Sequence, residues 1–214
     1  MKNPTDVVIA SAARTPVGAF NGSLGSLPAS ELGRTVISAA LERANVAPED
    51  VIEVIMGQIL TAGAGQNPAR QAAIGAGIPV ERTAMVINQL CGSGLRAVAL
   101  GFQSIRNGDA DVVIAGGQES MTQAPHCANL RSGQKLGSLE MIDSMLTDGL
   151  WDAFHGYHMG NTAENVAKQF NISREAQDAF AAASQQKAEA AQKADRFVAE
   201  ITPVVVKGRK AEVR

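Results

Sequence analysis

The segment from residue 92 to residue 106 constrains the fold most, because it has a helical period and is apolar on nearly every side. One face carries Leu95, Val98, Ala99, Phe102 and Ile105, and the other side carries Ala97, Leu100 and Gly101. A helix of this kind is normally buried. Apolar runs at residues 84–88 and 111–117 flank it and are typical of buried strands. We therefore expect a strand, a buried helix and another strand in succession.

The same alternation extends over the first 120 residues. The other elements predicted there are a strand at 7–10, a helix at 29–44, a strand at 51–60 and a short helix at 68–76. Pro28 suits the first turn of the longer helix, and Asn45 is expected to end it. Strands that alternate with helices favour an α/β layer with a largely parallel sheet.

The pattern changes near residue 121. Residues 121–159 show no sustained period, and irregular segments of this length are usually functional. Asn161 with Glu164 three residues later predicts the start of a helix. Ser173 is expected to cap a second, Ala-rich helix, and residues 201–206 predict a strand.

Charge and composition exclude several classes of function. The net charge is −2, which gives no electrostatic case for a nucleic-acid partner, and the basic run 207–210 is expected to be a solvated turn. No apolar run reaches the roughly 20 residues that span a bilayer, and the start lacks a secretory signal. Two cysteines suggest no disulfide framework, and His126 with Cys127 is too few ligands for a metal site. We expect a cytoplasmic protein without a metal or a membrane segment.

The strongest candidate for chemistry is Cys91, in the run from Asn88 to Gly94 between an expected strand and the buried helix. The small residues there allow a tight turn, as at the nucleophile elbow of serine hydrolases. The N–H groups and dipole of a helix start favour a thiolate, which is the form that attacks as a nucleophile. A free cysteine is also among the most buried residue types, so an inert structural cysteine is the alternative.

Several motifs in this order make the chain resemble the thiolase family, and the short-chain biosynthetic type most closely. The segments that carry the resemblance are Asn88–Gln89–Leu90–Cys91–Gly92–Ser93–Gly94–Leu95–Arg96–Ala97, Ala13–Arg14–Thr15–Pro16–Val17–Gly18, Gly116–Gly117–Gln118–Glu119–Ser120–Met121 and Gly156–Tyr157–His158–Met159–Gly160–Asn161–Thr162–Ala163–Glu164. The similarity covers essentially the whole chain, and it favours the nucleophilic interpretation of Cys91.

The resemblance implies the thiolase-type layered α/β fold, whose core consists of two similar halves. Residues 1–120 would form the amino-terminal half-core that carries the nucleophile. Residues 121–214 would form most of a loop domain that binds coenzyme A and makes tetramer contacts.

The resemblance also implies an acyltransferase. Cys91 would accept an acetyl group from acetyl-CoA, and a second acetyl-CoA would attack it to give acetoacetyl-CoA and CoA; the reverse reaction is a cleavage. Leu150, His158 and Met159 match positions that line the substrate pocket, whereas Arg14 is interpreted as structural. Coenzyme A thioesters would be substrates, with no permanently bound cofactor, and the assembly would be a homotetramer.

In one respect the chain departs from the family. The catalytic histidine, an asparagine that positions water, and a second catalytic cysteine lie in a second half that has no counterpart here. A base for the thiol and an acid/base for the α-carbon are chemically required, so this chain alone is expected to be inactive. The alternatives are a decarboxylating condensing enzyme of the ketoacyl-synthase kind and a non-catalytic thiolase-like protein that binds acyl-CoA or lipid.

Overall fold

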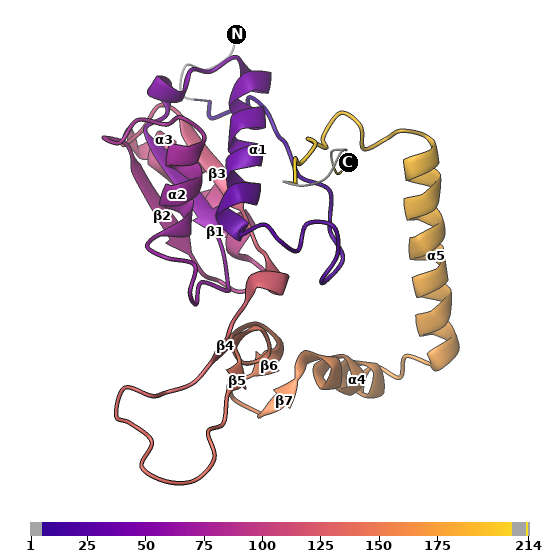
Figure 1. Cartoon of the computed structure of the whole chain (residues 1–214). Helices are drawn as coiled ribbons and strands as arrows, with labels where there is room; N and C mark the ends of the chain where they lie inside the picture. The colour runs from indigo at the N-terminus through magenta and orange to yellow at the C-terminus, as the bar shows by residue number, and fades with distance from the viewer. Residues whose placement is uncertain (1–5, 207–212, 214) are drawn as a thin grey trace.

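The computed structural model describes residues 6–206 and 213, so the basic run 207–210 lies outside the described residues. Its centre is a three-stranded parallel sheet in the order β2-β1-β3 (Figure 1). The strands are β1 (Glu53–Gly57), β2 (Thr83–Ile87) and β3 (Val113–Gly117). Both edge strands pair with β1 along its full length, with Gly57 opposite Ile87 and Gly117. The predicted parallel sheet is confirmed.

Two layers of helices cover this sheet. Helices α1 (Ala29–Ala44) and α2 (Pro68–Gly75) pack on one face, where Val54 and Met56 join the core cluster. Helix α3 (Ser93–Asn107) contacts β1 and β3 on the opposite face. Successive residues of a strand point to opposite faces, so β1 supplies side chains to both layers.

Local signals placed the ends of α1 correctly. Its buried residues are Ala29, Gly33, Ile37 and Leu41, which recur at the four-residue spacing of one helix face. Asn45 ends it in the left-handed conformation with φ of 51°, a position that favours Asn or Gly. Pro28 is the N-cap residue itself rather than a member of the first turn.

The outer face of α3 departs from the prediction of burial. Only Ser93, Ala97 and Gly101 are buried, because these small residues let the helix lie close to the sheet. The larger side chains point away from it: Leu95 is 78% exposed, and Phe102 is exposed as well. The helix therefore needs a further partner to bury the apolar face that the sequence specifies.

The two terminal strand predictions are wrong for the described residues. Residues 7–10 form no strand, and Ile9 is 81% exposed. Residues 201–206 make only isolated bridges, between Arg14 and Ile201 and between Val204 and Val213. A strand is stabilised by a ladder of hydrogen bonds to a neighbour, and neither segment finds a neighbouring strand among the described residues.

The residues after β3 form small elements that the sequence did not predict. A 3₁₀ turn (Met121–Gln123) is followed by a hairpin of β4 (His126–Cys127) and β5 (Ile142–Asp143), a π-helical turn (Leu146–Leu150), and a second hairpin of β6 (Trp151–Asp152) and β7 (Tyr157–His158). Another 3₁₀ turn, Pro48–Asp50, precedes β1. Strands of two residues leave little periodic pattern in the sequence, which explains why residues 121–159 showed no sustained period.

Two helices complete the described chain, α4 (Met159–Gln169) and α5 (Arg174–Lys193). Ser173 caps α5, accepting a hydrogen bond from the Ala176 N–H at 3.2 Å, as predicted. The predicted cap of α4 is wrong: Asn161 lies inside the helix, and His158 is the N-cap. Among the described residues, none of the helices combines the length and the apolar character that a membrane span requires.

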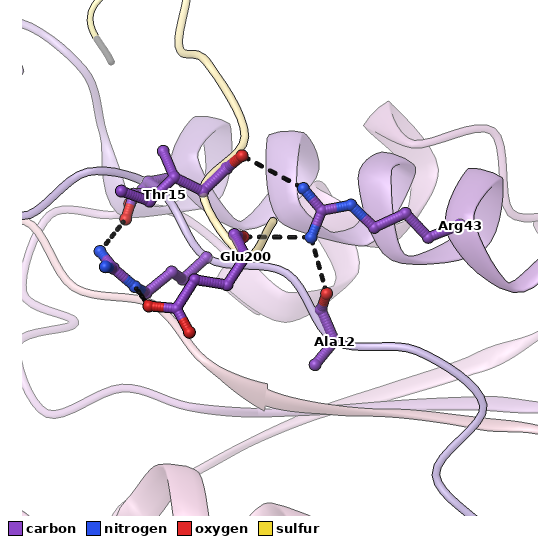
Figure 2. A network of polar contacts seen from close by, with 6 residues as sticks. Ala12, Thr15, Arg43 and Glu200 are labelled. Atoms are coloured by element: carbon purple, nitrogen blue, oxygen red, sulfur yellow. Dashed lines mark hydrogen bonds and ion pairs between the residues drawn. The ribbon is translucent and has the colours of Figure 1, made fainter. Parts of the chain in front are cut away.

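An arginine network joins the segment after α5 to the start of the chain (Figure 2). Arg43 of α1 donates to the carbonyl oxygens of Ala12 (2.7 Å), Glu200 (3.1 Å) and Ile201 (3.1 Å). Arg14 forms an ion pair with Glu200 at 2.7 Å and lies over the Phe197 ring. These contacts engage the Arg14 guanidinium within the fold, in agreement with a structural role.

Candidate active site

Cys91 lies at the carboxyl edge of the parallel sheet. Strands β1, β2 and β3 end at Gly57, Ile87 and Gly117, which are directly opposite one another in the register. The residues that follow all three strands therefore emerge at the same edge. In open α/β sheets this is the edge at which ligands bind.

The turn from β2 into α3 has a strained backbone and several side-chain hydrogen bonds. Leu90 has a φ of 48°, which is unfavourable for a branched side chain and costs about 1 kcal/mol. The Asn88 Oδ1 accepts from the Leu90 N–H at 2.9 Å. The buried Ser93 hydroxyl accepts from the Gln89 N–H at 2.8 Å and donates to the Leu90 carbonyl at 2.6 Å. Together these bonds hold the turn in a sharp bend.

This bend presents Cys91 to solvent immediately before α3. Cys91 is exposed and unpaired, which contradicts the alternative of a buried structural cysteine. The neighbouring N–H groups of Gly92 and Ser93 donate to the carbonyls of Gln89 (3.1 Å) and Leu90 (3.0 Å). No hydrogen bond found among the described residues uses the Cys91 N–H. The arrangement leaves an accessible thiol at a helix amino terminus, where the dipole favours negative charge.

The glycine that ends β1 allows the start of α3 to lie directly on the sheet. A Cβ at Gly57 would lie 2.5 Å from the Ser93 carbonyl carbon and 2.6 Å from the Gly94 nitrogen. A Cβ at Gly117 would lie 3.4 Å from the Gly94 Cα. Gly57 at the end of β1 therefore fixes how closely the turn that carries Cys91 approaches the strand ends.

A buried amide pair at this edge was missed by the sequence analysis. Gln118 donates through Nε2 to the Gln58 Oε1 at 2.9 Å, and Gln58 donates through Nε2 to the Leu60 carbonyl at 2.8 Å. Gln58 is 2% exposed and Gln118 is 6% exposed. The available signal was the Gly–Gln dipeptide at the end of both β1 and β3, in which the glycine is the last residue of the strand.

Glu119 is a second group that sequence reasoning did not assign. Its half-buried carboxylate accepts hydrogen bonds from the Ile59 N–H at 2.8 Å and the Leu60 N–H at 3.4 Å. Burial raises the pKa of Glu119 above its usual value, while the hydrogen bonds from Ile59, Leu60 and Ser120 oppose that rise. The carboxylate therefore joins the end of β3 to the turn after β1.

The three predicted pocket residues lie together at the base of the second hairpin. Trp151 pairs with His158 across β6 and β7, which brings the flanking Leu150 and Met159 to the same end. The half-buried His158 accepts through Nδ1 from the Gly160 N–H at 2.9 Å, and this bond caps α4. No hydrogen bond of the described residues links these three side chains to Cys91.

The tip of that hairpin contains a His–Asp pair. The His155 Nδ1 lies 2.8 Å from the Asp152 Oδ2, and the His155 ring stacks on Tyr157. Hydrogen bonds from the Phe154 N–H and from His155 lower the pKa of Asp152. This pair shapes an exposed turn, and the described residues contain no group of three or more His, Cys, Asp or Glu side chains that could hold a metal ion.

Comparison with known proteins agrees with this geometry. The chain matches the family described as "Thiolase, N-terminal domain" over residues 7–214. It is 65% identical to an acetyl-CoA acetyltransferase of Shinella zoogloeoides over 213 residues, covering 100% of this chain and 54% of that protein. It is 59% identical to the cytosolic acetyl-CoA acetyltransferase of Rattus norvegicus, covering 95% of this chain and 51% of that protein.

The chain thus spans about half the length of the curated relatives it matches. The family match extends over the sheet, the Cys91 turn and the hairpin that carries His158. The α/β fold and the exposed cysteine at the carboxyl edge of the sheet agree with it. The chain belongs to the thiolase family, and it corresponds to the family's N-terminal domain.

Proposed function

We propose that the complete protein containing this chain is an acetyl-CoA C-acetyltransferase in which Cys91 carries the acetyl group. The observation that carries the proposal is the exposed thiol between β2 and α3, at the edge where all three strands end. The names of the relatives support acetyl-CoA as the substrate. No permanently bound cofactor is part of the proposal.

In the first step, the Cys91 thiolate attacks the carbonyl carbon of acetyl-CoA, and the bond from that carbon to the CoA sulfur breaks. CoA leaves and takes up a proton. In the second step, another acetyl-CoA loses an α-proton to a base, and its α-carbon attacks the acetyl thioester on Cys91. A carbon–carbon bond forms, the Cys91 thiolate leaves, and acetoacetyl-CoA is released. The developing oxyanions need preorganised N–H donors, for which the Cys91 N–H is available.

The residues that remove these protons are expected outside this chain. No hydrogen bond of the described residues links Cys91 to a histidine or a carboxylate. The test therefore uses a fusion, called the chimera below, of residues 1–214 to the part of the Shinella zoogloeoides relative that this chain does not cover. The chimera should cleave acetoacetyl-CoA in the presence of CoA, and residues 1–214 alone should not.

Trapping then identifies the nucleophile. After incubation of the chimera with acetyl-CoA and rapid acid quenching, mass spectrometry should find one acetyl group on the peptide that contains Cys91. Tight binding of acetyl-CoA without an adduct would favour the non-catalytic binder. Turnover of a malonyl thioester with loss of CO₂ would favour the ketoacyl-synthase-like enzyme.

We expect His158 to bind substrate rather than to perform chemistry. Because His158 also caps α4, His158→Ala should cost about 1 kcal/mol of stability and raise the KM for acetoacetyl-CoA more than it lowers kcat. His158→Asn is the matched control, since Asn keeps a capping acceptor but lacks the ring. A raised KM in His158→Asn with restored thermal stability supports substrate binding, whereas a collapse of kcat at unchanged KM contradicts it.

We also propose a cytoplasmic homotetramer built from two dimers. The cytosolic rat relative and the two free cysteines support a reducing compartment. The long loop between β4 and β5 carries Leu136, which is 92% exposed and suits a protein contact. Light scattering on the chimera should give four times the protomer mass, and Leu136→Lys should reduce it to a dimer. A monomer in both proteins would contradict this.

A further inference from the structure

The turn after β1 is held on several sides by residues from the end of β3. Glu119 accepts from the N–H groups of Ile59 and Leu60, and Gln58 donates to the Leu60 carbonyl while Gln118 holds Gln58. Both backbone polar groups of Leu60 are therefore satisfied by side chains. Leu60 is buried, so its backbone groups cannot bond to solvent and depend on these side chains instead.

The anchored turn supports the segment that carries a predicted pocket residue. A Cβ at Gly149 would lie 3.5 Å from the Leu60 Cδ2 and 3.9 Å from the Ile59 Cγ2, so the backbone of the π-helical turn rests on these two side chains. Leu60 is buried beneath it. Leu150 is the next residue, at the end of that turn and directly before β6. Contact therefore runs from Glu119 through the Ile59–Leu60 turn to the backbone beside Leu150.

The charge of Glu119 is unusual for a purely structural group. No ion pair of the described residues includes this carboxylate, and burial disfavours its charged form. A half-buried carboxylate without an ion pair, held by several oriented hydrogen bonds, is a candidate for a role in a functional site.

We propose that Glu119 is a positioning residue, whose carboxylate fixes the Ile59–Leu60 turn and thereby places the pocket wall at Leu150 for the thioester substrate. Glu119 touches neither substrate nor Cys91 in this role. The inference rests on the proposed function, since a pocket wall matters only to a protein that binds the thioester.

Two measurements on the same variants test it. The first is hydrogen exchange, followed by mass spectrometry, of peptides covering residues 59–60 and 146–150, in residues 1–214 and in the chimera. The second is the KM and kcat of the chimera with acetoacetyl-CoA. Glu119→Ala should accelerate exchange in both peptides and raise KM about tenfold, with kcat changed less than about twofold.

Glu119→Gln is the conservative variant, because its amide oxygen can still accept from the Ile59 N–H. It should restore most of the protection and most of the KM. Should Glu119→Ala fail to fold, Glu119→Asp replaces it, because its carboxylate is one methylene too short to reach Ile59. Glu81→Gln, which changes an exposed carboxylate before β2, is the matched control and should alter neither measurement.

Three results would overturn the proposal. If exchange and KM are both unchanged in Glu119→Ala, Glu119 does not hold the Ile59–Leu60 turn. If exchange is faster but KM is unchanged, Glu119 holds the turn without placing the pocket wall for the substrate. A collapse of kcat in Glu119→Gln would make Glu119 a chemical group. A chimera that lacks activity before any substitution would instead contradict the proposed function, while the exchange of the 59–60 and 146–150 peptides would still decide whether Glu119 holds the turn.

Discussion

Replacing Cys91 by alanine should reduce cleavage of acetoacetyl-CoA by the chimera about 10⁴-fold or more, and no acetyl group should be trapped. Alanine leaves nothing to form the thioester, and the hydrogen-bond donors around the site cannot replace a covalent nucleophile. Because Cys91 is exposed and its side chain makes no hydrogen bond among the described residues, the substitution should leave the fold intact.

Cys127→Ser is the matched control for this experiment. Cys127 is half-buried in β4, in the first hairpin, and within the described part of the chain its thiol makes only a long contact of 3.9 Å to the Pro125 carbonyl. Activity should remain within about twofold of the unmodified chimera. An acetyl adduct on Cys127, or full activity in Cys91→Ala, would refute the assignment of the nucleophile.

The second large effect is expected from Gly57→Ala, which should destabilise the protein by about 3 kcal/mol or prevent folding altogether. The added Cβ would lie 2.5 Å from the Ser93 carbonyl carbon, and the atoms it meets include backbone that cannot rotate away. The helix α3 would have to move off β1, which would displace the turn that carries Cys91. Denaturant unfolding of the chimera, monitored by circular dichroism, measures the loss of stability.

Gly94→Ala tests whether this effect depends on position. Gly94 lies on the other side of the same contact, but the nearest atoms to its added Cβ are 3.9 Å away. Alanine is also the better helix former, so stability should be unchanged or should rise by about 0.5 kcal/mol. Equal destabilisation by the two substitutions would show that the close approach at Gly57 is not the cause.

The sequence predicted the elements that depend on neighbouring residues. The helix over Ala29–Ala44 and its end at Asn45 follow from helical spacing and a residue that tolerates positive φ. The Ser173 cap follows from a hydroxyl that reaches an N–H three residues on. The Cys91 motif could also be recognised from neighbouring residues, because the turn is built from residues within about one helical turn of the cysteine.

Elements that depend on distant partners were predicted poorly. Residues 7–10 have the composition of a strand, but a strand forms only where another strand pairs with it. The apolar outer face of α3 likewise indicated burial, yet what covers such a face is not encoded in the face itself. His158 took the capping position expected for Asn161 because the Nδ1 of its ring accepts from the Gly160 N–H, and histidine is not among the preferred capping residues.

The motif around Cys91 could thus be recognised in the sequence, whereas the surroundings of the site could not. Gln58 and Gln118 meet only because β1 and β3 pair in the register that sets Gly57 opposite Gly117. Glu119 reaches Ile59 for the same reason, across 60 residues of chain. A register shift of one residue would turn these side chains to the opposite face of the sheet. Strand pairing is a property of the folded chain as a whole. It alone decided which polar groups lie beside Cys91 at the carboxyl edge of the sheet.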